Sequence, residues 1–139
     1  MILQTDNRLN DNINRFGCYF MSLLFVINKH VGYKLSTVVI TKLYLELVEL
    51  RFMDTNCYIK DPEGILNYLG LKCKYTNRHE PPKYKAKHDE IEILCLQYPN
   101  YKHFIVGDGN GNISFNPMGV TADNAYIHSK RIFKLLWAY

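Results

Sequence analysis

The chain has 139 residues, and 47% of them are hydrophobic, a content that excludes an intrinsically disordered chain. This length fits one domain, so we expect residues 1–139 to fold around a single core. The formal charge of +4 is modest and thinly spread, so we expect no nucleic-acid partner.

The hydropathy pattern contains no apolar run of about 18 residues, so we expect no membrane-spanning helix. The first residues also lack the basic stretch followed by an apolar stretch that is typical of a signal peptide. We therefore expect a cytoplasmic protein, in which disulfides are rare. Nothing in the sequence indicates its oligomeric state.

Helices are predicted in the first half of the chain. Residues 1–16 are polar and rich in Asn, and they predict an irregular lead-in. Apolar residues then recur at helical spacing, which predicts a helix from Gly17 to about His30. The residues of this apolar face are Phe20, Leu23, Leu24, Ile27 and Val31.

Two further helices are indicated by their capping residues. Ser36 is a suitable N-cap for a helix that continues to about Arg51. Asp61 and Pro62 predict the start of the third helix, and Gly70 predicts its end. The apolar face expected for the second helix consists of Val39, Leu43, Leu47 and Leu50.

Strands are predicted after Gly70. The pattern indicates a strand over residues 71–76 and then a long polar loop over residues 77–90, which contains a Pro pair. Residues 117–128 form a connection of no definite class. The remaining predicted strands cover residues 91–98, 103–107, 112–116 and 130–137. Helices followed by antiparallel strands predict an α+β fold.

The turn Asp108-Gly-Asn-Gly111 predicts a hairpin between two of these strands. If Gly109 and Asn110 form the loop, His103 lies directly opposite Asn116 and both project from one face. An Asn110-Gly111 loop instead shifts the register by two residues and places His103 opposite Met118. Asn116 is then a diagonal neighbour, so either register keeps the Asn near the His.

The four cysteines have different settings. Cys18 lies at the start of the first predicted helix, where the positive end of the helix dipole lowers a thiol pKa. Cys73 and Cys95 lie in strand-like segments and are expected to be small core residues, whereas the setting of Cys57 is ambiguous. No Cys/His pair has zinc-ligand spacing, so we expect no metal and no cofactor.

Cys18, His103 and Asn116 together have the chemistry of a thiol hydrolase. The amide oxygen of Asn116 can accept the N–H of one imidazole nitrogen of His103 and leave the other nitrogen for a nucleophile. A protonated His103 would also lower the pKa of the Cys18 thiol. The sequence therefore predicts a catalytic triad assembled from residues far apart in the chain.

The motifs around these three residues resemble those of the papain-like cysteine peptidases. They are Phe16–Phe20 with its Gly17-Cys18 pair, His103–Val106, and Phe115–Gly119 with its Asn-Pro pair. The chain resembles the minimal bacterial form of this superfamily. It is similar to the double-glycine peptidases that process bacteriocin leaders, and to small bacterial and phage-associated members of the superfamily. The resemblance covers about residues 12–137.

The resemblance implies a papain-like fold, in which N-terminal helices pack on a C-terminal antiparallel sheet. It implies that Cys18 is the nucleophile, His103 the general base and acid, and Asn116 the orienting residue. The family commonly has a Gln six residues before the Cys as oxyanion donor; here this position is Asn12, and Gln4 is a second candidate. The residues Gly17-Cys18-Tyr19 also depart from the family pattern at the nucleophile.

We expect the protein to hydrolyse a peptide or isopeptide bond in a peptide or protein substrate. The alternative is a binding module on a peptidase-like scaffold without catalysis, which would use the basic loop from Arg78 to Lys87. The two hypotheses predict that different substitutions remove the function of the protein. Changing Cys18 abolishes the function of an enzyme, whereas reversing the charges of Lys83, Lys85 and Lys87 disrupts a binding module in a salt-sensitive way.

Overall fold

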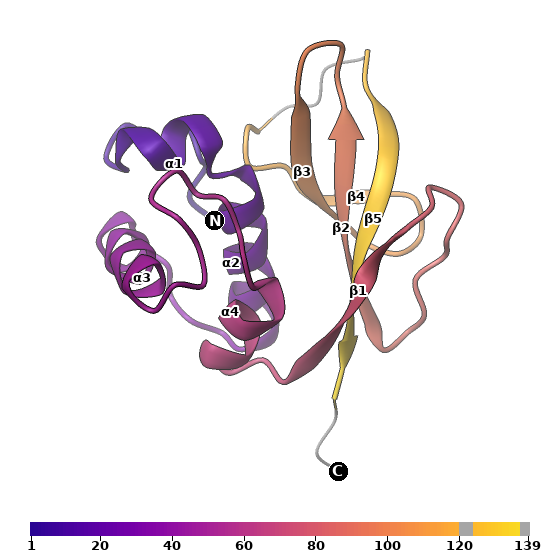
Figure 1. Ribbon diagram of the computed structural model, residues 1–139, viewed down its shortest axis with the longest axis horizontal. Coiled ribbons are helices and arrows are strands. Elements are labelled where there is room, and N and C mark those ends of the chain that lie inside the picture. The colour runs from indigo at the N-terminus through magenta and orange to yellow at the C-terminus, as the bar shows by residue number, and fades with distance from the viewer. Residues whose placement is uncertain (120–123, 137–139) are drawn as a thin grey trace.

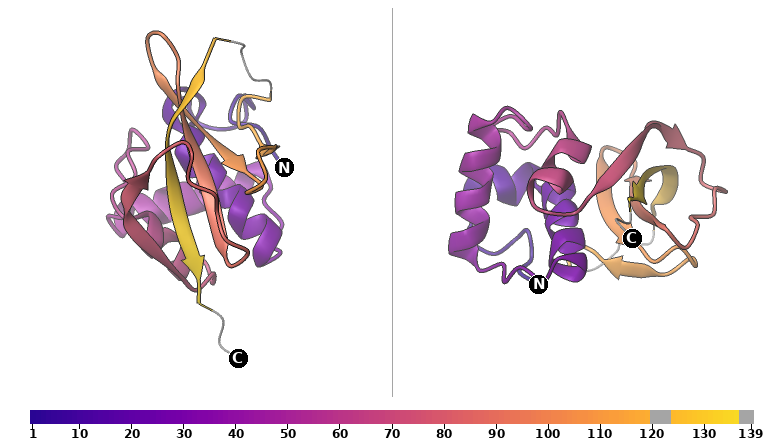
Figure 2. Two further views of the ribbon diagram at one scale, coloured as in Figure 1. Left: turned by 90° about the vertical axis from the view of Figure 1, so that its right-hand side faces the viewer. Right: turned by 90° about the horizontal axis from the view of Figure 1, so that it is seen from below.

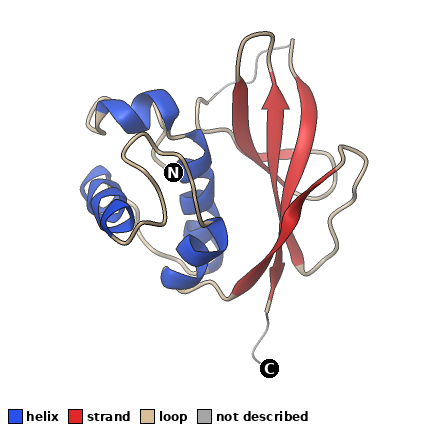
Figure 3. Cartoon of the chain, in the orientation of Figure 1, coloured by secondary structure: helices blue, strands red, loops and turns tan. Residues whose placement is uncertain are grey.

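The computed structural model describes residues 1–119 and 124–136, without the side chains of residues 77 and 78. Within these residues four helices come first and five antiparallel strands follow, which confirms the predicted α+β class. The helices gather on one side of the sheet (Figures 1 and 3), and the view from below shows the same separation (Figure 2). The predicted end of the last strand at Trp137 lies outside the described residues.

The N-terminal segment is not the irregular lead-in that was predicted, because it contains helix α1, Asp11–Phe16. The Asn10 side chain caps this helix by accepting the N–H of Ile13. With six residues and only Ile13 buried, α1 is too short to show a helical period in the sequence. The N-cap residue was its one local signal.

Helix α2, Cys18–His30, confirms the first predicted helix and follows α1 directly. Gly17 joins the two helices, and a Cβ at this position would lie 2.5 Å from the carbonyl oxygen of Ile13. Only glycine therefore allows α1 and α2 to meet so closely. The close contact places Cys18 at the exact N-terminal residue of the central helix.

Helices α3, Thr37–Glu49, and α4, Pro62–Tyr68, begin at the predicted caps. The side chains of Ser36 and Asp61 accept backbone N–H groups of their first turns. The predicted face of α3 is confirmed in part: Leu47 is buried, and Val39 and Leu43 are partly buried against the core. The fully buried residues are Ile40, Tyr44 and Leu47, so the centre of the buried face is rotated from the predicted one. The prediction for Leu50 was wrong, because Leu50 is 45% exposed.

The sheet has the order β1-β5-β2-β3-β4, with every neighbouring pair antiparallel. Strand β1 extends through part of the predicted polar loop because it pairs with β5 as far as Glu80 and Lys130. Strand β5 begins earlier than predicted because its first residues, from Tyr126 to Ser129, pair with β2. Cross-strand hydrogen bonds therefore override the polar composition. The bounds are β1 Cys73–Glu80, β2 Glu90–Gln97, β3 Lys102–Gly107, β4 Ile113–Phe115 and β5 Tyr126–Leu135.

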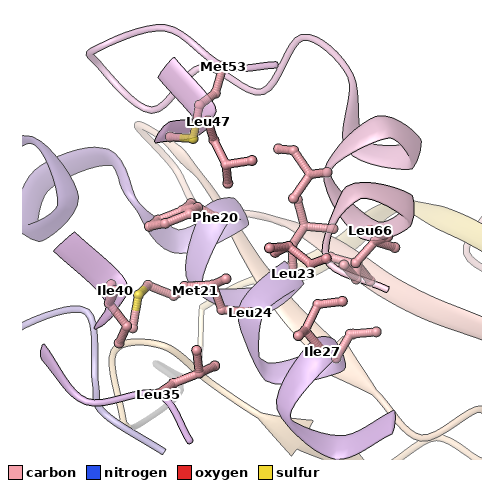
Figure 4. Packing of buried hydrophobic residues seen from close by; sticks show 14 of the residues in the cluster. Phe20, Met21, Leu23, Leu24, Ile27, Leu35, Ile40, Leu47, Met53 and Leu66 are labelled. Atoms are coloured by element: carbon pink, nitrogen blue, oxygen red, sulfur yellow. The ribbon is translucent and has the colours of Figure 1, made fainter. Parts of the chain in front are cut away.

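The main core lies between the helices and one face of the sheet. Helix α2 is its centre, and the side chains of Phe20, Leu23 and Ile27 are fully buried among residues of the other helices (Figure 4). Phe104 and Val106 of β3 pack against this core. The other face of the sheet carries a smaller cluster of Leu94, Leu96, Tyr98 and Ile105.

The hairpin of β3 and β4 pairs Val106 with Phe115, so the first predicted register was wrong and the alternative holds at this pair. The register then shifts, and Gly107 pairs with Ile113. The side-chain carboxylate of Glu92 occupies the space that a Cβ on Gly107 would need, which favours glycine at this irregularity. Ile113 is 47% exposed and lies outside the core.

Candidate active site

His103 and Asn116 form a direct hydrogen bond on the face of β3 that carries the smaller cluster. The distance from His103 Nε2 to Asn116 Oδ1 is 2.8 Å. The same Oδ1 accepts the backbone N–H of Met118 at 3.0 Å, which identifies this atom as the oxygen of the amide. Because an oxygen without hydrogen can only accept, Nε2 of His103 carries the proton and Nδ1 is the basic nitrogen.

The His103 ring is 6% exposed, and the edge of Tyr98 lies against it with 6.4 Å between the ring centroids. Burial lowers the pKa of His103, and the hydrogen bond with Asn116 opposes this effect only in part. Among the described residues Nδ1 has no hydrogen-bond partner. The resting imidazole is therefore neutral near pH 7 and has one free basic nitrogen.

Cys18 lies at the edge of β3 beside Phe104, the residue that follows His103, and no hydrogen bond among the described residues joins its sulfur to the His103 ring. The backbone N–H of Phe104 donates a hydrogen bond to the Cys18 sulfur, and the Ser22 hydroxyl donates to the Phe104 carbonyl at 3.4 Å. Cys18 and Ser22 are one helical turn apart, so one face of α2 binds both backbone groups of Phe104. Because the nitrogen of Phe104 is bonded to the carbonyl carbon of His103, this contact places the thiol beside the His103 backbone.

This edge of β3 is open to α2 because β4 is short. Strand β4 pairs only with Val106 and Gly107, which leaves the backbone of Phe104 without a strand partner on that side. Helix α2 takes the place of the missing strand. The sequence carried no signal for this contact, because it depends on where β4 ends.

The thiol of Cys18 has a raised pKa, not the lowered one expected at a helix N-terminus. Burial has the largest effect and raises the pKa, while the N–H groups of Phe104, Tyr19 and Cys18 itself favour the thiolate and lower it. Desolvation therefore outweighs the helix terminus. The resting pair consists of a neutral thiol and a neutral imidazole, not of a thiolate and an imidazolium.

A cavity of about 730 Å³, which we call the Cys18 cleft, opens beside the thiol. Cys57 also lines it, but burial raises the pKa of that thiol to about 12. Cys57, Cys73 and Cys95 are all at least 97% buried, and all four cysteines are free. The described lining residues are Arg15, Phe16, Cys18, Tyr19, Asn56, Cys57, Tyr58, Ile59, Lys60, Pro62, Tyr75, His79, Tyr101, Lys102, Phe104 and Arg131.

The two predicted oxyanion residues lie in different settings. Asn12 is exposed on α1, and its backbone carbonyl accepts the Cys57 thiol hydrogen at 3.7 Å. Gln4 is 3% exposed and lies near the segment that follows Asn116, because its backbone N–H donates to the carbonyl of Pro117 at 2.9 Å. Its Nε2 already donates to Asn14, and its Oε1 is buried without a partner.

The basic loop is separate from this site. Lys83, Lys85 and Lys87 are exposed, and the loop lies on the side of the sheet away from the helices (Figure 1). No helix among residues 1–119 and 124–136 has the length and apolarity to cross a bilayer. Over the same residues, no three His, Cys, Asp or Glu side chains are placed to share a metal ion.

Arg131 is the cleft residue that sequence reasoning missed. It lies in the middle of β5, 8% exposed, and its guanidinium carbon is 5.3 Å from the centroid of the Phe104 ring. Arg131 ends a run of polar residues, 128–131, so nothing in the sequence signals that it faces a cleft. The pairing of β5 with β2 decides which face it occupies.

One comparison with known proteins gives a match. A family model described as "Protein of unknown function, DUF261" matches residues 1–135. No curated protein and no solved structure matches the chain.

Proposed function

The chain belongs to the DUF261 family, and we propose that it is a thiol hydrolase that cleaves a peptide or isopeptide bond through Cys18, His103 and Asn116. The observation that supports this most is the orientation of the His103 ring. Asn116 holds its protonated Nε2, so the basic Nδ1 remains available on a residue whose backbone adjoins the Cys18 sulfur. A papain-like fold is part of the same proposal.

The neutral resting pair defines the first step. His103 Nδ1 takes the proton of the Cys18 thiol as the sulfur attacks the carbonyl carbon of the substrate. The imidazolium then gives that proton to the leaving amine, and a thioester remains on Cys18. Water attacks the thioester, His103 accepts its proton and returns it to the sulfur, and the acid product leaves.

The oxyanion of each tetrahedral intermediate needs hydrogen-bond donors. The backbone N–H of Cys18 belongs to the first turn of α2, where N–H groups have no partner within the helix. The side-chain amide of Asn12 or of Gln4 would supply the second donor. Gln4 would first have to release its hydrogen bond to Asn14.

Peptide-library cleavage, read by mass spectrometry, tests this proposal. We expect cleavage by the wild-type protein and a loss of about 10³-fold or more in Cys18→Ala and in His103→Ala. Cys57→Ala is the matched control, because it removes another thiol of the same cleft and should keep the activity. Equal cleavage by Cys18→Ala and the wild-type protein would refute the hydrolase.

The second candidate is a binding module that acts through its basic loop. Its support is the exposure of Lys83, Lys85 and Lys87 on a side remote from the helices. Reversing these three charges to Glu should then abolish the biological effect in a salt-sensitive way. If Cys18→Ala keeps the full effect and the charge reversal removes it, the binding module replaces the hydrolase.

A further inference from the structure

Arg131 is a buried cation without an acidic partner. It is 8% exposed, it lines the Cys18 cleft, and it forms no salt bridge with any carboxylate among residues 1–119 and 124–136. Its Nη1 donates to the hydroxyl of Ser129 at 2.6 Å. A guanidinium has five N–H donors, so most of its hydrogen-bonding capacity is unused by the described residues.

The sheet keeps acidic groups away from this cation. Arg131 pairs with Ile93 on β2 and with His79 on β1, and these residues share its face. The neighbouring carboxylates of Glu80 and Glu92 are at alternate positions, paired with Lys130 and Ile132, and so they project from the opposite face. Arg131 therefore meets neutral or basic groups on its own face.

The cleft around Arg131 is also free of acids. No Asp or Glu is among its described lining residues, whereas Arg15, Lys60 and Lys102 line it. Of these, Lys60 has an acidic partner in Asp54, at 3.2 Å. The electrostatic potential in the cleft is therefore positive, and burial makes it strongest at Arg131.

Tyr19 supplies a second unused donor in the same place. Its hydroxyl oxygen is buried without a hydrogen-bond partner in the described chain, and burial raises the pKa of this phenol, an effect that the charge of Arg131 opposes only in part. Its ring stacks on Phe104 at 4.3 Å between centroids, and the guanidinium carbon of Arg131 lies 5.3 Å from the centroid of the same Phe104 ring. Cys18, Tyr19 and Arg131 all line the same cleft, so these donors share one cavity with the thiol.

We propose that Arg131 and the Tyr19 hydroxyl form a subsite that binds a carboxylate of the substrate next to the bond attacked by Cys18. The planar guanidinium suits a carboxylate, which accepts two parallel N–H bonds. The carboxylate is either an Asp or Glu side chain or the terminal carboxylate of a peptide. This substrate class rests on the proposed function, but its binding is measurable without turnover.

Protection of Cys18 from iodoacetamide measures this binding. Three acetylated tripeptides serve as probes: Ala-Glu-Ala amide, Ala-Gln-Ala amide, and Ala-Gln-Ala with a free terminal carboxylate. We expect half-protection at an about tenfold lower concentration for at least one carboxylate peptide than for the neutral Gln peptide, as one charge-assisted hydrogen bond predicts. Which carboxylate peptide protects identifies the source of the group.

Variants then connect the preference with Arg131. Arg131→Gln should remove the preference for a carboxylate peptide over the neutral Gln peptide, and Arg131→Lys should keep part of this preference. Lys102→Gln removes an exposed cation of the same cleft and should keep most of the preference. Equal protection by all three peptides in the wild-type protein overturns the subsite, whether or not any variant folds. A preference that survives in folded Arg131→Gln also overturns it.

The outcomes separate this inference from the proposed function. An Arg131-dependent preference for carboxylate peptides, in a protein that cleaves no peptide, supports the subsite and contradicts the proposed hydrolase activity. Cleavage of the library without a preference for acidic peptides supports the hydrolase activity and contradicts the proposed carboxylate subsite.

Discussion

Replacing Asn116 by Ala should destabilise the protein by about 2–4 kcal/mol, because two N–H groups lose their acceptor. The Nε2–H of His103 is then buried without a partner, at a cost of about 1–3 kcal/mol. The N–H of Met118 is only partly buried and can reach water, so the loss of its acceptor adds about 1 kcal/mol.

Asn116→Asp is the informative comparison, because a carboxylate accepts both hydrogen bonds. We expect a smaller loss of stability near neutral pH, and the new charge should raise the pKa of His103. In the wild-type protein that pKa lies below the unfolded value of about 6.5. The folded state then binds fewer protons than the unfolded state, so His103 makes stability fall as the pH falls below about 6.5.

In Asn116→Asp the sign of this contribution reverses. A folded pKa above the unfolded value gives stability that is present below about pH 6.5 and lost as the pH rises through the folded pKa. Urea unfolding followed by circular dichroism between about pH 5 and 8 measures the difference from wild type. Taking this difference cancels His30 and His79, whose pKa values burial also lowers.

A double-mutant cycle with His103→Leu completes the test. The coupling free energy between positions 103 and 116 should be about 1 kcal/mol or more, since the bond is short and buried. If Asn116→Ala costs less than about 0.5 kcal/mol and shows no coupling to His103, the argued orientation of the ring is wrong.

Two further predictions concern the neighbourhood of the thiol. The rate of iodoacetamide labelling at Cys18 should rise with pH through an inflection above about 8.5, the value of a free thiol, because burial raises its pKa; mass spectrometry should find Cys18 labelled ahead of Cys57, and an inflection below 7 would contradict the neutral resting pair. Gly17→Ala should lower the free energy of unfolding by about 1–3 kcal/mol or more, since its Cβ would overlap the Ile13 carbonyl. Urea unfolding checks this, and an unchanged midpoint would show that α1 does not need its close contact with α2.

Local signals in the sequence determined much of the fold. Ser36 and Asp61 can cap only the turn that follows them, so the starts of α3 and α4 were predictable from short segments. The apolar period likewise identified α2, because a helix that is the centre of a core needs a broad buried face. The pairing of His103 with Asn116 followed from the short turn between them, in either register.

The parts that were wrong depend on distant segments. β1 continues through a polar segment because β5 supplies its hydrogen bonds, and the hairpin takes the shifted register beside a carboxylate of β2. The buried face of α3 was decided by what packs on it. Which apolar residues a helix buries can change by one position at little local cost in free energy, and only the packing of the other helices decides it.

The sequence by itself determined which side chains could perform thiol chemistry and in what order they occur, because residue type and local motif are enough to propose a nucleophile, a base and an orienting amide. Only the tertiary structure decided their ionisation and their surroundings. Burial raises the pKa of Cys18 against the effect expected from its position on α2, because desolvation depends on everything packed around the sulfur. Arg131 faces the cleft because strand pairing, which no local segment encodes, sets the face of each residue in β5.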